Sequence, residues 1–357
     1  MPLVSPFETS FGVEKVKEAV IVILKKNGLT AYGECVAATG PWYSEETIAS
    51  AKYIIKQLLA PIALKEELAT PAEFLDRTKG IRGNNMAIAT VEMALWDLMG
   101  KLTHTPLSKL IGGERNEVQV GVSVGIQPTI QDLLDKVGSY LNDGYRRIKI
   151  KIKPGYDLEP VKEIRKKYSK ILLQVDANSA FSLQDSNILR ELDKFNLLLI
   201  EQPLAHDDII DHSKLQKLLN TPICLDESIH SVEDAQKAIE IGACRIINIK
   251  SGRMRGILCS KSLHDLCQRH QIPVWCGGML ETGIGRAFNV ALASLPGFAL
   301  PGDISASKRY FRRDIITKEF ELTRSGTLEV PTGPGIGVDV DPTLLDACTT
   351  SKETLTA

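Results

Sequence analysis

Five ionisable residues each stand at the end of an apolar run of the chain, and they recur at a nearly constant interval. They are Lys151, Asp176, Glu201, Asp226 and Lys250. Successive members are about 25 residues apart, which is the length that a strand, a helix and two short loops take in an α/β protein. Each run is therefore predicted to be a parallel β-strand that ends in one charged residue. Consecutive parallel strands of a barrel end at the same rim, so the five charged groups are expected to meet in one pocket.

Three of these residues are carboxylic acids on consecutive predicted strands. Like charges at close range raise one another's pKa and destabilise a fold, so the three acids need a common counter-charge. A divalent cation supplies it, and ligation by carboxylate oxygens favours Mg²⁺, with Mn²⁺ as the alternative, over Zn²⁺. The competing interpretation is that each acid caps a helix or pairs with a surface lysine, and the common register of the three disfavours it.

The lysines indicate proton transfer at a carbon atom. Lys149, Lys151 and Lys153 alternate with isoleucines, so their ammonium groups are expected on one face of the second predicted strand. Lysines also occur on solvated edge strands, but a strand of a parallel sheet is covered on both faces, so these lysines must face the mouth of a barrel. Lys250 ends the sixth strand and is expected across the barrel from them. A metal would hold a substrate carboxylate and stabilise the enediolate that forms when the adjacent C–H group loses its proton.

A lysine acts as a base only when it is neutral, which requires a pKa near ~7 instead of ~10.4. Lys149 beside Lys151, and Arg253 beside Lys250, are expected to lower the pKa of the two bases, together with the cation. The carboxylates oppose this change, but the metal is expected to take up most of their charge.

The composition excludes several classes of protein. The chain has 357 residues, of which 43% are hydrophobic and 24% charged, so it can hold a barrel of ~250 residues and about 100 further residues. A formal net charge of −1 gives no basic excess for nucleic acid, and no apolar stretch reaches the ~18 residues of a membrane span. The N-terminus shows no signal-peptide pattern, and the seven cysteines are scattered without a CxxC pair. A cytoplasmic protein that binds a small-molecule carboxylate is predicted, and the sequence leaves a homo-oligomer open.

The first part of the chain has the element order of an α+β domain. Residues 1–115 are predicted to form it, with an antiparallel hairpin at 18–36 followed by helices at 44–59, 71–79 and 84–102. The last of these helices is apolar on nearly every side and is therefore expected to be buried.

From residue 116 the pattern changes to alternating strands and helices. Residues 116–310 hold eight strand candidates, from VQVGVSVG near residue 118 to PVWCGGM at 273–279 and FALPGDI at 298–304. This alternation predicts an α/β fold with a closed parallel barrel that carries the active site. The C-terminal segment 311–357 is strand-like and rich in glycine and proline, and it is expected to return to the first domain.

A set of motifs covers the chain from end to end: SPFETSFG, GECVA, KIKIKPG, VDAN, EQPL, LDES, NIKSGR, GGMLETGIGRA and LEVPTGPGIGVDVD. With these motifs the chain resembles the enolase superfamily, in its muconate-lactonising-enzyme-like subgroup. Within that subgroup it is most similar to the o-succinylbenzoate synthase/N-succinylamino acid racemase branch. The resemblance implies an α+β capping domain in front of a (β/α)₇β TIM-type barrel.

The same resemblance implies roles for the five charged residues. Asp176, Glu201 and Asp226 are implied metal ligands, Lys151 is the implied general base, and Lys250 stands on the other face of the substrate. In the implied lyase reaction, 2-succinyl-6-hydroxy-2,4-cyclohexadiene-1-carboxylate loses water to give 2-succinylbenzoate, a step toward menaquinone. Lys151 takes the α-proton and returns it to the departing hydroxyl group, while Lys250 stays protonated and stabilises the enediolate by a cation–π contact. In the racemase reaction the two lysines exchange roles.

Further residues are expected around the pocket. Those predicted to contact substrate or to support the charged groups are Ser123, Lys149, Asn178, Arg253, Met279 and Glu281. Simple barrel packing explains Ser123 and Met279 equally well. Because side chains alternate along a strand, Glu227 is expected on the face opposite to Asp226.

Two smaller groups complete the expected site. Phe7, Trp42 and Tyr43 lie in predicted loops of the first domain and are interpreted as a specificity lid, since an exposed Pro-Trp-Tyr is unusual. Cys224 and Cys276 fall on inward-facing strand positions and are interpreted as small buried fillers.

Three alternatives to the dehydratase remain open. The racemase of N-succinylamino acids uses the same residues, and both activities can coexist in one site. A catalytically silent binding barrel is disfavoured because every predicted ligand and both lysines are present. A sugar-acid dehydratase of the same superfamily is disfavoured because no histidine ends the sixth or seventh strand.

Overall fold

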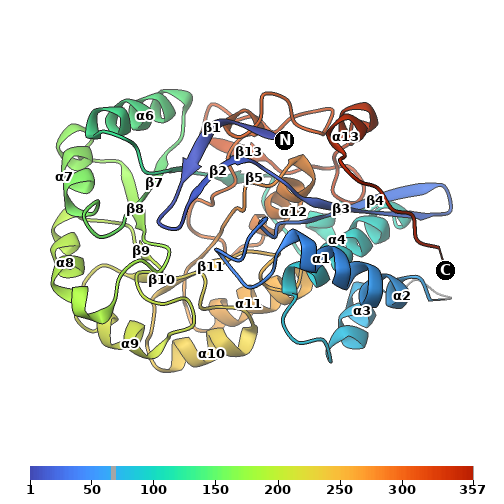
Figure 1. Ribbon diagram of the computed structural model, residues 1–357, viewed down its shortest axis with the longest axis horizontal. Coiled ribbons are helices and arrows are strands. Elements are labelled where there is room, and N and C mark those ends of the chain that lie inside the picture. Colours follow the sequence, from blue (N-terminus) through green and yellow to red (C-terminus); the bar gives the residue numbers. More distant parts are fainter. Residues whose placement is uncertain (66–69, 357) are drawn as a thin grey trace.

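Residues 1–65 and 70–356 are described by the computed structural model, which shows a mixed α/β protein (Figure 1). Its largest sheet has seven parallel strands, in the order β12-β11-β10-β9-β8-β7-β6. These strands are β6 (Val122–Val124), β7 (Arg147–Lys151), β8 (Leu172–Asp176), β9 (Ile200–Glu201), β10 (Ile223–Leu225), β11 (Ile246–Ile249) and β12 (Val274–Cys276). Each strand pairs with the next one along the chain, as a β/α alternation requires.

A helix follows each of these strands and covers the outside of the sheet. These helices are α6 (Ile130–Asp143), α7 (Leu158–Lys167), α8 (Ser186–Glu191), α9 (Ile210–Gln216), α10 (Val232–Glu240), α11 (Ile257–Arg269) and α12 (Gly283–Ala293). Helices α6 to α10 run around the left and lower edge of the molecule in Figure 1. Gly144 ends α6 in the left-handed conformation that glycine adopts without strain.

The two edges of the parallel sheet approach the same segment of chain. Phe298 forms a parallel bridge to Val274 of β12, and Gly302 forms a parallel bridge to Val120, just before β6. The prediction of a regular strand at 298–304 is nevertheless wrong, since only single bridges form there. Pro301 has no N–H group to continue the ladder, which gives a physical reason for the interruption.

The predicted strand VQVGVSVG is also divided in two. Its first half is β5 (Glu117–Gln119), which pairs antiparallel with β13 (Thr327–Glu329) and lies outside the parallel sheet. The division falls at Gly121, where a Cβ atom would lie 2.4 Å from Nε of Arg147. The buried Arg147 side chain therefore occupies the space beside the break.

The first region agrees in outline with the prediction. The hairpin of β3 (Val20–Lys26) and β4 (Leu29–Cys35) turns at Asn27 and Gly28, which both have positive φ. A second, unpredicted hairpin joins β1 (Pro2–Glu8) and β2 (Val13–Val16). The helices are α1 (Ile48–Ile54), a π-helical segment (Ile55–Leu59), α2 (Ala60–Ala63), α3 (Pro71–Thr78), α4 (Asn85–Leu102) and α5 (Leu107–Leu110).

Helix α1 begins four residues later than predicted. Thr47 is its N-cap and accepts a hydrogen bond from the backbone N–H group of Ser50. Glu46 lies outside the helix, and its carboxylate accepts hydrogen bonds from the N–H groups of Met86 and Ala87 at the start of α4. Helix α4 is buried along most of its length, as its composition predicts.

The end of the chain contacts the first region. The backbone of Gly335 exchanges hydrogen bonds with Thr105 and Leu107, and Asp97 of α4 accepts one from the N–H group of Ile336. Beyond α13 (Pro342–Cys348), Glu353 forms an ion pair with Lys56. Within the described residues, no helix has the combination of length and apolar character that crossing a membrane requires.

Candidate active site

Two lysines of β7 lie among the carboxylates of the neighbouring strands. Strand pairing places Lys151 beside Asp176, and Asp176 beside Glu201. Lys151 Nζ donates to Asp176 Oδ2 at 2.7 Å and to Asn178 Oδ1 at 2.6 Å. Lys149 Nζ donates to Asp176 Oδ2 at 3.0 Å and to Glu201 Oε2 at 2.9 Å. All of these side chains except Asn178 are buried, so Lys149 and Lys151 form the predicted cluster and not a solvated edge. The prediction is wrong for Lys153, which follows the end of β7, is partly exposed and pairs with Glu8.

The other half of the cluster is built around Asp226 at the end of β10. Lys250, directly after β11, donates from Nζ to Asp226 Oδ2 at 2.7 Å. Arg253 forms an ion pair with Asp226 Oδ1. The hydroxyl group of Tyr43 completes this group, at 3.1 Å from Asp226 Oδ1, 3.2 Å from Lys250 Nζ and 2.9 Å from Arg253 Nη1. Tyr43 therefore reaches from the first region into the mouth of the parallel sheet.

Glu227 lies in the same site, and its predicted position on the opposite face is wrong. Asn178 Nδ2 donates to Glu227 Oε1 at 3.0 Å, while Asn178 Oδ1 accepts from Lys151. Strand β10 ends at Leu225, so the alternation of side chains no longer applies two residues later. The second oxygen of the buried Glu227 carboxylate has no hydrogen-bond partner.

Burial and charge move the pKa values of the clustered groups in opposite directions. Burial, followed by the charges of Asp176 and Asp226, raises the pKa of Glu201 to about 8. Burial also acts to raise the pKa of Asp226, but Lys250 and Arg253 outweigh it and hold this pKa below its usual value.

The pKa of Lys250 is raised, against the expectation of a lowered one. Burial alone lowers it, yet the charges of Asp226, Tyr43 and Glu227 outweigh burial. The physical reason is the direct ion pair with Asp226, because this carboxylate stabilises the protonated form of Lys250.

The donor set fits a divalent cation in its chemistry. Three buried carboxylates lie close enough for two of them to raise the pKa of the third, so a cation between them would be stabilised. As the side chains stand in the described residues, no three His, Cys, Asp or Glu groups converge to hold a metal ion. The Lys149 ammonium group lies within 3.0 Å of both Asp176 and Glu201, so it supplies positive charge between two of the three carboxylates.

Sequence reasoning missed one member of the cluster, Asp303. Its Oδ2 accepts from Ser123 Oγ at 2.8 Å and pairs with Lys149 Nζ at 2.6 Å, and its Oδ1 accepts from Arg147 Nη1 at 2.6 Å. Ser123 thus supports this carboxylate from β6. The signal was present in the sequence, because Asp303 ends the apolar run FALPGD just as the other acids end theirs.

The remaining predicted residues lie around this centre. Met279 is half-buried and packs against the apolar cluster of the first region, and Glu281 accepts a hydrogen bond from Asn289 of α12 at 2.9 Å. The ring of Phe7 lies 5.9 Å from Lys151 Nζ, and that of Tyr43 lies 4.4 Å from Lys250 Nζ. Trp42 points to solvent and is 67% exposed, so of the pair only Tyr43 turns inward.

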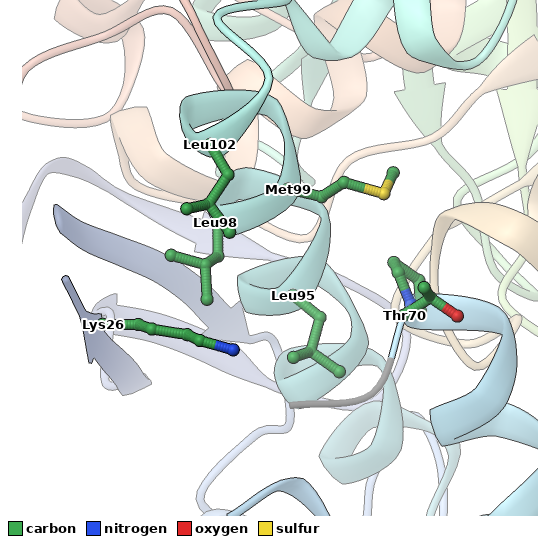
Figure 2. A pocket seen from close by; sticks show the side chains of 7 residues that line it. Lys26, Thr70, Leu95, Leu98, Met99 and Leu102 are labelled. Carbon is green, nitrogen blue, oxygen red and sulfur yellow. The ribbon is translucent and has the colours of Figure 1, made fainter. Parts of the chain in front are cut away.

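A separate cavity of about 120 Å³ lies in the first region (Figure 2). In Figure 2 helix α4 lies between Lys26 of β3 and Thr70, with Leu98 on the side of Lys26 and Met99 pointing toward Thr70. None of its lining residues belongs to the charged cluster, so this cavity takes no part in proton transfer by the lysines.

The chain belongs to the enolase superfamily. Residues 132–344 match the family described as "Enolase C-terminal domain-like", and residues 1–112 match the "Mandelate racemase / muconate lactonizing enzyme, N-terminal domain". A crystal structure of an enolase superfamily member from Listeria innocua Clip11262 has a TM-score of 0.94 and 45% identity, over 98% of this chain and 94% of that one.

Two curated relatives show where in the superfamily the similarity is high. The chain is 51% identical over 342 residues to an o-succinylbenzoate synthase of Geobacillus kaustophilus, over 96% of this chain and 91% of that protein. It is 49% identical over 353 residues to an N-succinylamino acid racemase of an Amycolatopsis species, over 99% of this chain and 95% of that protein.

Proposed function

We propose that this protein is a metal-dependent hydro-lyase that converts 2-succinyl-6-hydroxy-2,4-cyclohexadiene-1-carboxylate into 2-succinylbenzoate, a step toward menaquinone. The single observation that carries the proposal is the pair of buried lysines, Lys151 and Lys250. Each is ion-paired with a carboxylate of a neighbouring strand, and their strands, β7 and β11, have three others between them. The high identity to proteins named o-succinylbenzoate synthase supports this choice of substrate.

The two lysines have different tasks in the dehydration. Lys151 removes the proton next to the substrate carboxylate and delivers it to the departing hydroxyl group, so that water leaves from the same face. Lys250 remains protonated and faces the planar enediolate from the other side, where its positive charge is stabilising. Asn178 orients Lys151 through its side-chain oxygen, and Tyr43 and Arg253 orient the Lys250–Asp226 pair.

Asp176, Glu201 and Asp226 are the residues that would hold the cation, Mg²⁺ or alternatively Mn²⁺. When bound, the cation supplies positive charge at the substrate carboxylate and so makes the neighbouring C–H proton more acidic. Lys149 and Asp303 would support these ligands, since Lys149 bonds to two of them and to Asp303.

A second activity, racemisation of N-succinylamino acids, is favoured by the same pair of lysines. The two enantiomers present their Cα–H bonds to opposite faces, so each lysine removes the proton from one enantiomer and delivers a proton to the other. Relatives named N-succinylamino acid racemase are 49% and 47% identical to this chain.

The finer architecture is part of the same proposal. We infer a closed (β/α)₇β barrel over residues 116–310, a capping domain over 1–115 and a C-terminal segment, 311–357, that returns to the capping domain. The bridges of Phe298 and Gly302 to both edges of the sheet, and the contacts of Gly335 with Thr105 and Leu107, support this division. The proposal includes a cytoplasmic location and a small-molecule carboxylate as substrate. It is compatible with a monomer and with a homo-oligomer.

The proposal is tested by turnover with Mg²⁺. The cyclohexadiene substrate and N-succinylphenylalanine are assayed side by side, and their kcat/KM values are compared. Dehydration is expected for the wild-type protein and is expected to disappear in Lys151→Ala. If the protein neither dehydrates the diene nor exchanges the α-proton of any succinyl-bearing acid, it is the silent binding barrel instead.

A further inference from the structure

We propose that Asn85, in the first turn of α4, is a positioning residue for the Lys250 side of the active site. The inference rests on the function proposed above, in which Lys250 stabilises the enediolate during dehydration and transfers a proton during racemisation. The side-chain amide of Asn85 donates from Nδ2 to the carbonyl oxygen of Arg253 at 2.9 Å and to that of His230 at 3.2 Å. One group of the capping domain therefore joins the loops that follow β10 and β11.

Those two loops are already joined from within the barrel by Arg253. Its guanidinium group donates to the carbonyl oxygens of Ile229 at 2.6 Å and Asn248 at 2.5 Å, in addition to its ion pair with Asp226. Asn85 holds the backbone of the same arginine and of the residue next to Ile229. The amide and the guanidinium group together form a clamp that fixes Asp226 and Lys250 relative to each other.

The capping domain also holds the residues that follow Arg253 in the chain. Glu92, two turns further along α4, accepts hydrogen bonds from the N–H groups of Ile257 and Leu258, both at 2.9 Å. Arg255 donates to the carbonyl oxygens of Ile81 and Thr78, both at 3.1 Å. These contacts anchor the start of α11, so the clamp at Asn85 acts at the end of the segment nearest to Lys250.

The Lys151 side of the site has no contact with Asn85. Lys151 is held by Asp176 and Asn178, and the capping domain reaches that side through Ser10, whose hydroxyl group donates to the carbonyl oxygen of Asn178 at 3.2 Å. Loss of the Asn85 amide is therefore expected to move Lys250 and to leave Lys151 in place. Such a change is visible only in a measurement that separates the two lysines.

Exchange of the α-proton of N-succinylphenylalanine in D₂O with Mg²⁺ provides that separation. The enantiomer whose exchange disappears in Lys250→Ala is the one that depends on Lys250. In Asn85→Ala the exchange rate of this enantiomer is expected to fall about 10- to 100-fold, because a small misplacement of a catalytic group can cost up to about 100-fold. The exchange rate of the other enantiomer is expected to change less than about 3-fold, within the reach of a small general effect.

Two variants complete the design. Thr90→Val removes a buried hydrogen bond within α4, from Thr90 Oγ1 to the Met86 carbonyl oxygen at 2.7 Å, and is expected to leave the ratio of the two exchange rates unchanged. Ser10→Ala is expected to change the ratio in the opposite direction. The ratio is measured within one sample, so a smaller folded fraction in any variant cancels.

Each outcome either supports or overturns the positioning role of Asn85. Equal losses for both enantiomers in Asn85→Ala, or an unchanged ratio, overturn the positioning role while the proposed function stands. If the wild-type protein dehydrates the diene but exchanges neither enantiomer, kcat for dehydration decides: a value for Asn85→Ala within about 3-fold of that for Thr90→Val overturns the positioning role, and a fall of about 10-fold or more supports it. A wild-type protein that does neither reaction removes the proposed function itself.

Discussion

The hydroxyl oxygen of Tyr43 and the ammonium nitrogen of Lys250 lie 3.2 Å apart, although the two residues are 207 positions apart in the chain. The ammonium group also stands 4.4 Å from the centre of the Tyr43 ring. A loop after β4 thus supplies both a hydrogen-bond acceptor and an aromatic face to the lysine that follows β11. The first region of the chain is in this way part of the candidate site.

Removing the Tyr43 hydroxyl group tests this contribution. Tyr43→Phe keeps the ring over Lys250 but loses the contacts with Lys250, Arg253 and Asp226. We expect kcat for dehydration to fall about 10-fold with KM nearly unchanged, since a hydrogen bond to a charged group contributes about 1.5–3 kcal/mol. Tyr53→Phe, which changes a 64% exposed tyrosine of α1, is the matched control and should behave as wild type. A large rise in KM alone would instead assign Tyr43 to substrate binding.

The second prediction concerns Lys149, which touches three carboxylates. Lys149→Met removes the ion pair of Glu201, while Asp176 keeps Lys151 and Asp303 keeps Arg147, and breaking a buried ion pair typically costs about 3–5 kcal/mol. We expect a lower midpoint of thermal unfolding that Mg²⁺ raises more in the variant than in the wild type. The comparison is made by circular dichroism with and without the metal. An equal effect of Mg²⁺ on both proteins contradicts a metal site between these acids.

Metal dependence has its own test. Treatment with a chelator is expected to abolish dehydration, and added Mg²⁺ is expected to restore it, with Mn²⁺ as the alternative. Glu201→Gln removes one charged oxygen ligand and is expected to weaken Mg²⁺ binding by at least about 10-fold in calorimetric titration. Glu18→Gln changes an exposed glutamate outside the cluster's contacts and should leave the affinity unchanged. Full activity after chelation is the result that contradicts the proposal.

A pH dependence of stability is expected from Glu92, through which α4 contacts the start of α11. Burial raises the pKa of this carboxyl from 4.5 to about 7, although Leu258, Ile257 and Trp96 donate hydrogen bonds to it. The folded state therefore binds the proton more tightly than the unfolded state. The associated stability is present below pH 4.5 and is lost as the pH rises to about 7, by about 3 kcal/mol in total.

Urea unfolding at pH 5 and pH 8 measures this contribution. In Glu92→Gln the titrating group is absent, so the difference in unfolding free energy between wild type and variant should favour the wild type more at pH 5 than at pH 8. Glu18→Gln again serves as the exposed control. If the difference in unfolding free energy between wild type and Glu92→Gln is the same at both pH values, the pKa of Glu92 does not change on folding and the prediction is contradicted.

The charged cluster could be predicted because its signal is local. An apolar run that ends in one charged residue predicts both a strand and the position of its carboxyl end. The interval of about 25 residues predicts the order of the strands. Lys151, Asp176 and Glu201 accordingly meet through strand pairing alone. Asp226 and Lys250 follow one residue after their strands and still converge.

The failures have a common physical cause, which is that the deciding partner lies far away in the chain. Residues 117–119 leave the parallel sheet because β13, about two hundred positions later, pairs with them. The direction of Glu227 depends on Asn178, and the inward position of Tyr43 depends on Arg253 and Lys250. No periodicity within one segment carries that information.

The last prediction separates the hydrogen bond of Glu227 from its charge. Glu227 Oε1 accepts from Asn178 Nδ2, and Asn178 in turn orients Lys151 through Oδ1. Glu227→Gln keeps an oxygen that can accept this hydrogen bond, whereas Glu227→Ala frees the Asn178 amide to turn. We expect Glu227→Ala to lower kcat for dehydration about 10-fold and Glu227→Gln to lower it less than about 3-fold, because only the alanine variant lets Lys151 lose its orientation. If both variants lose the same activity, Lys151 depends on the negative charge of Glu227 and not on the hydrogen bond that reaches it through Asn178.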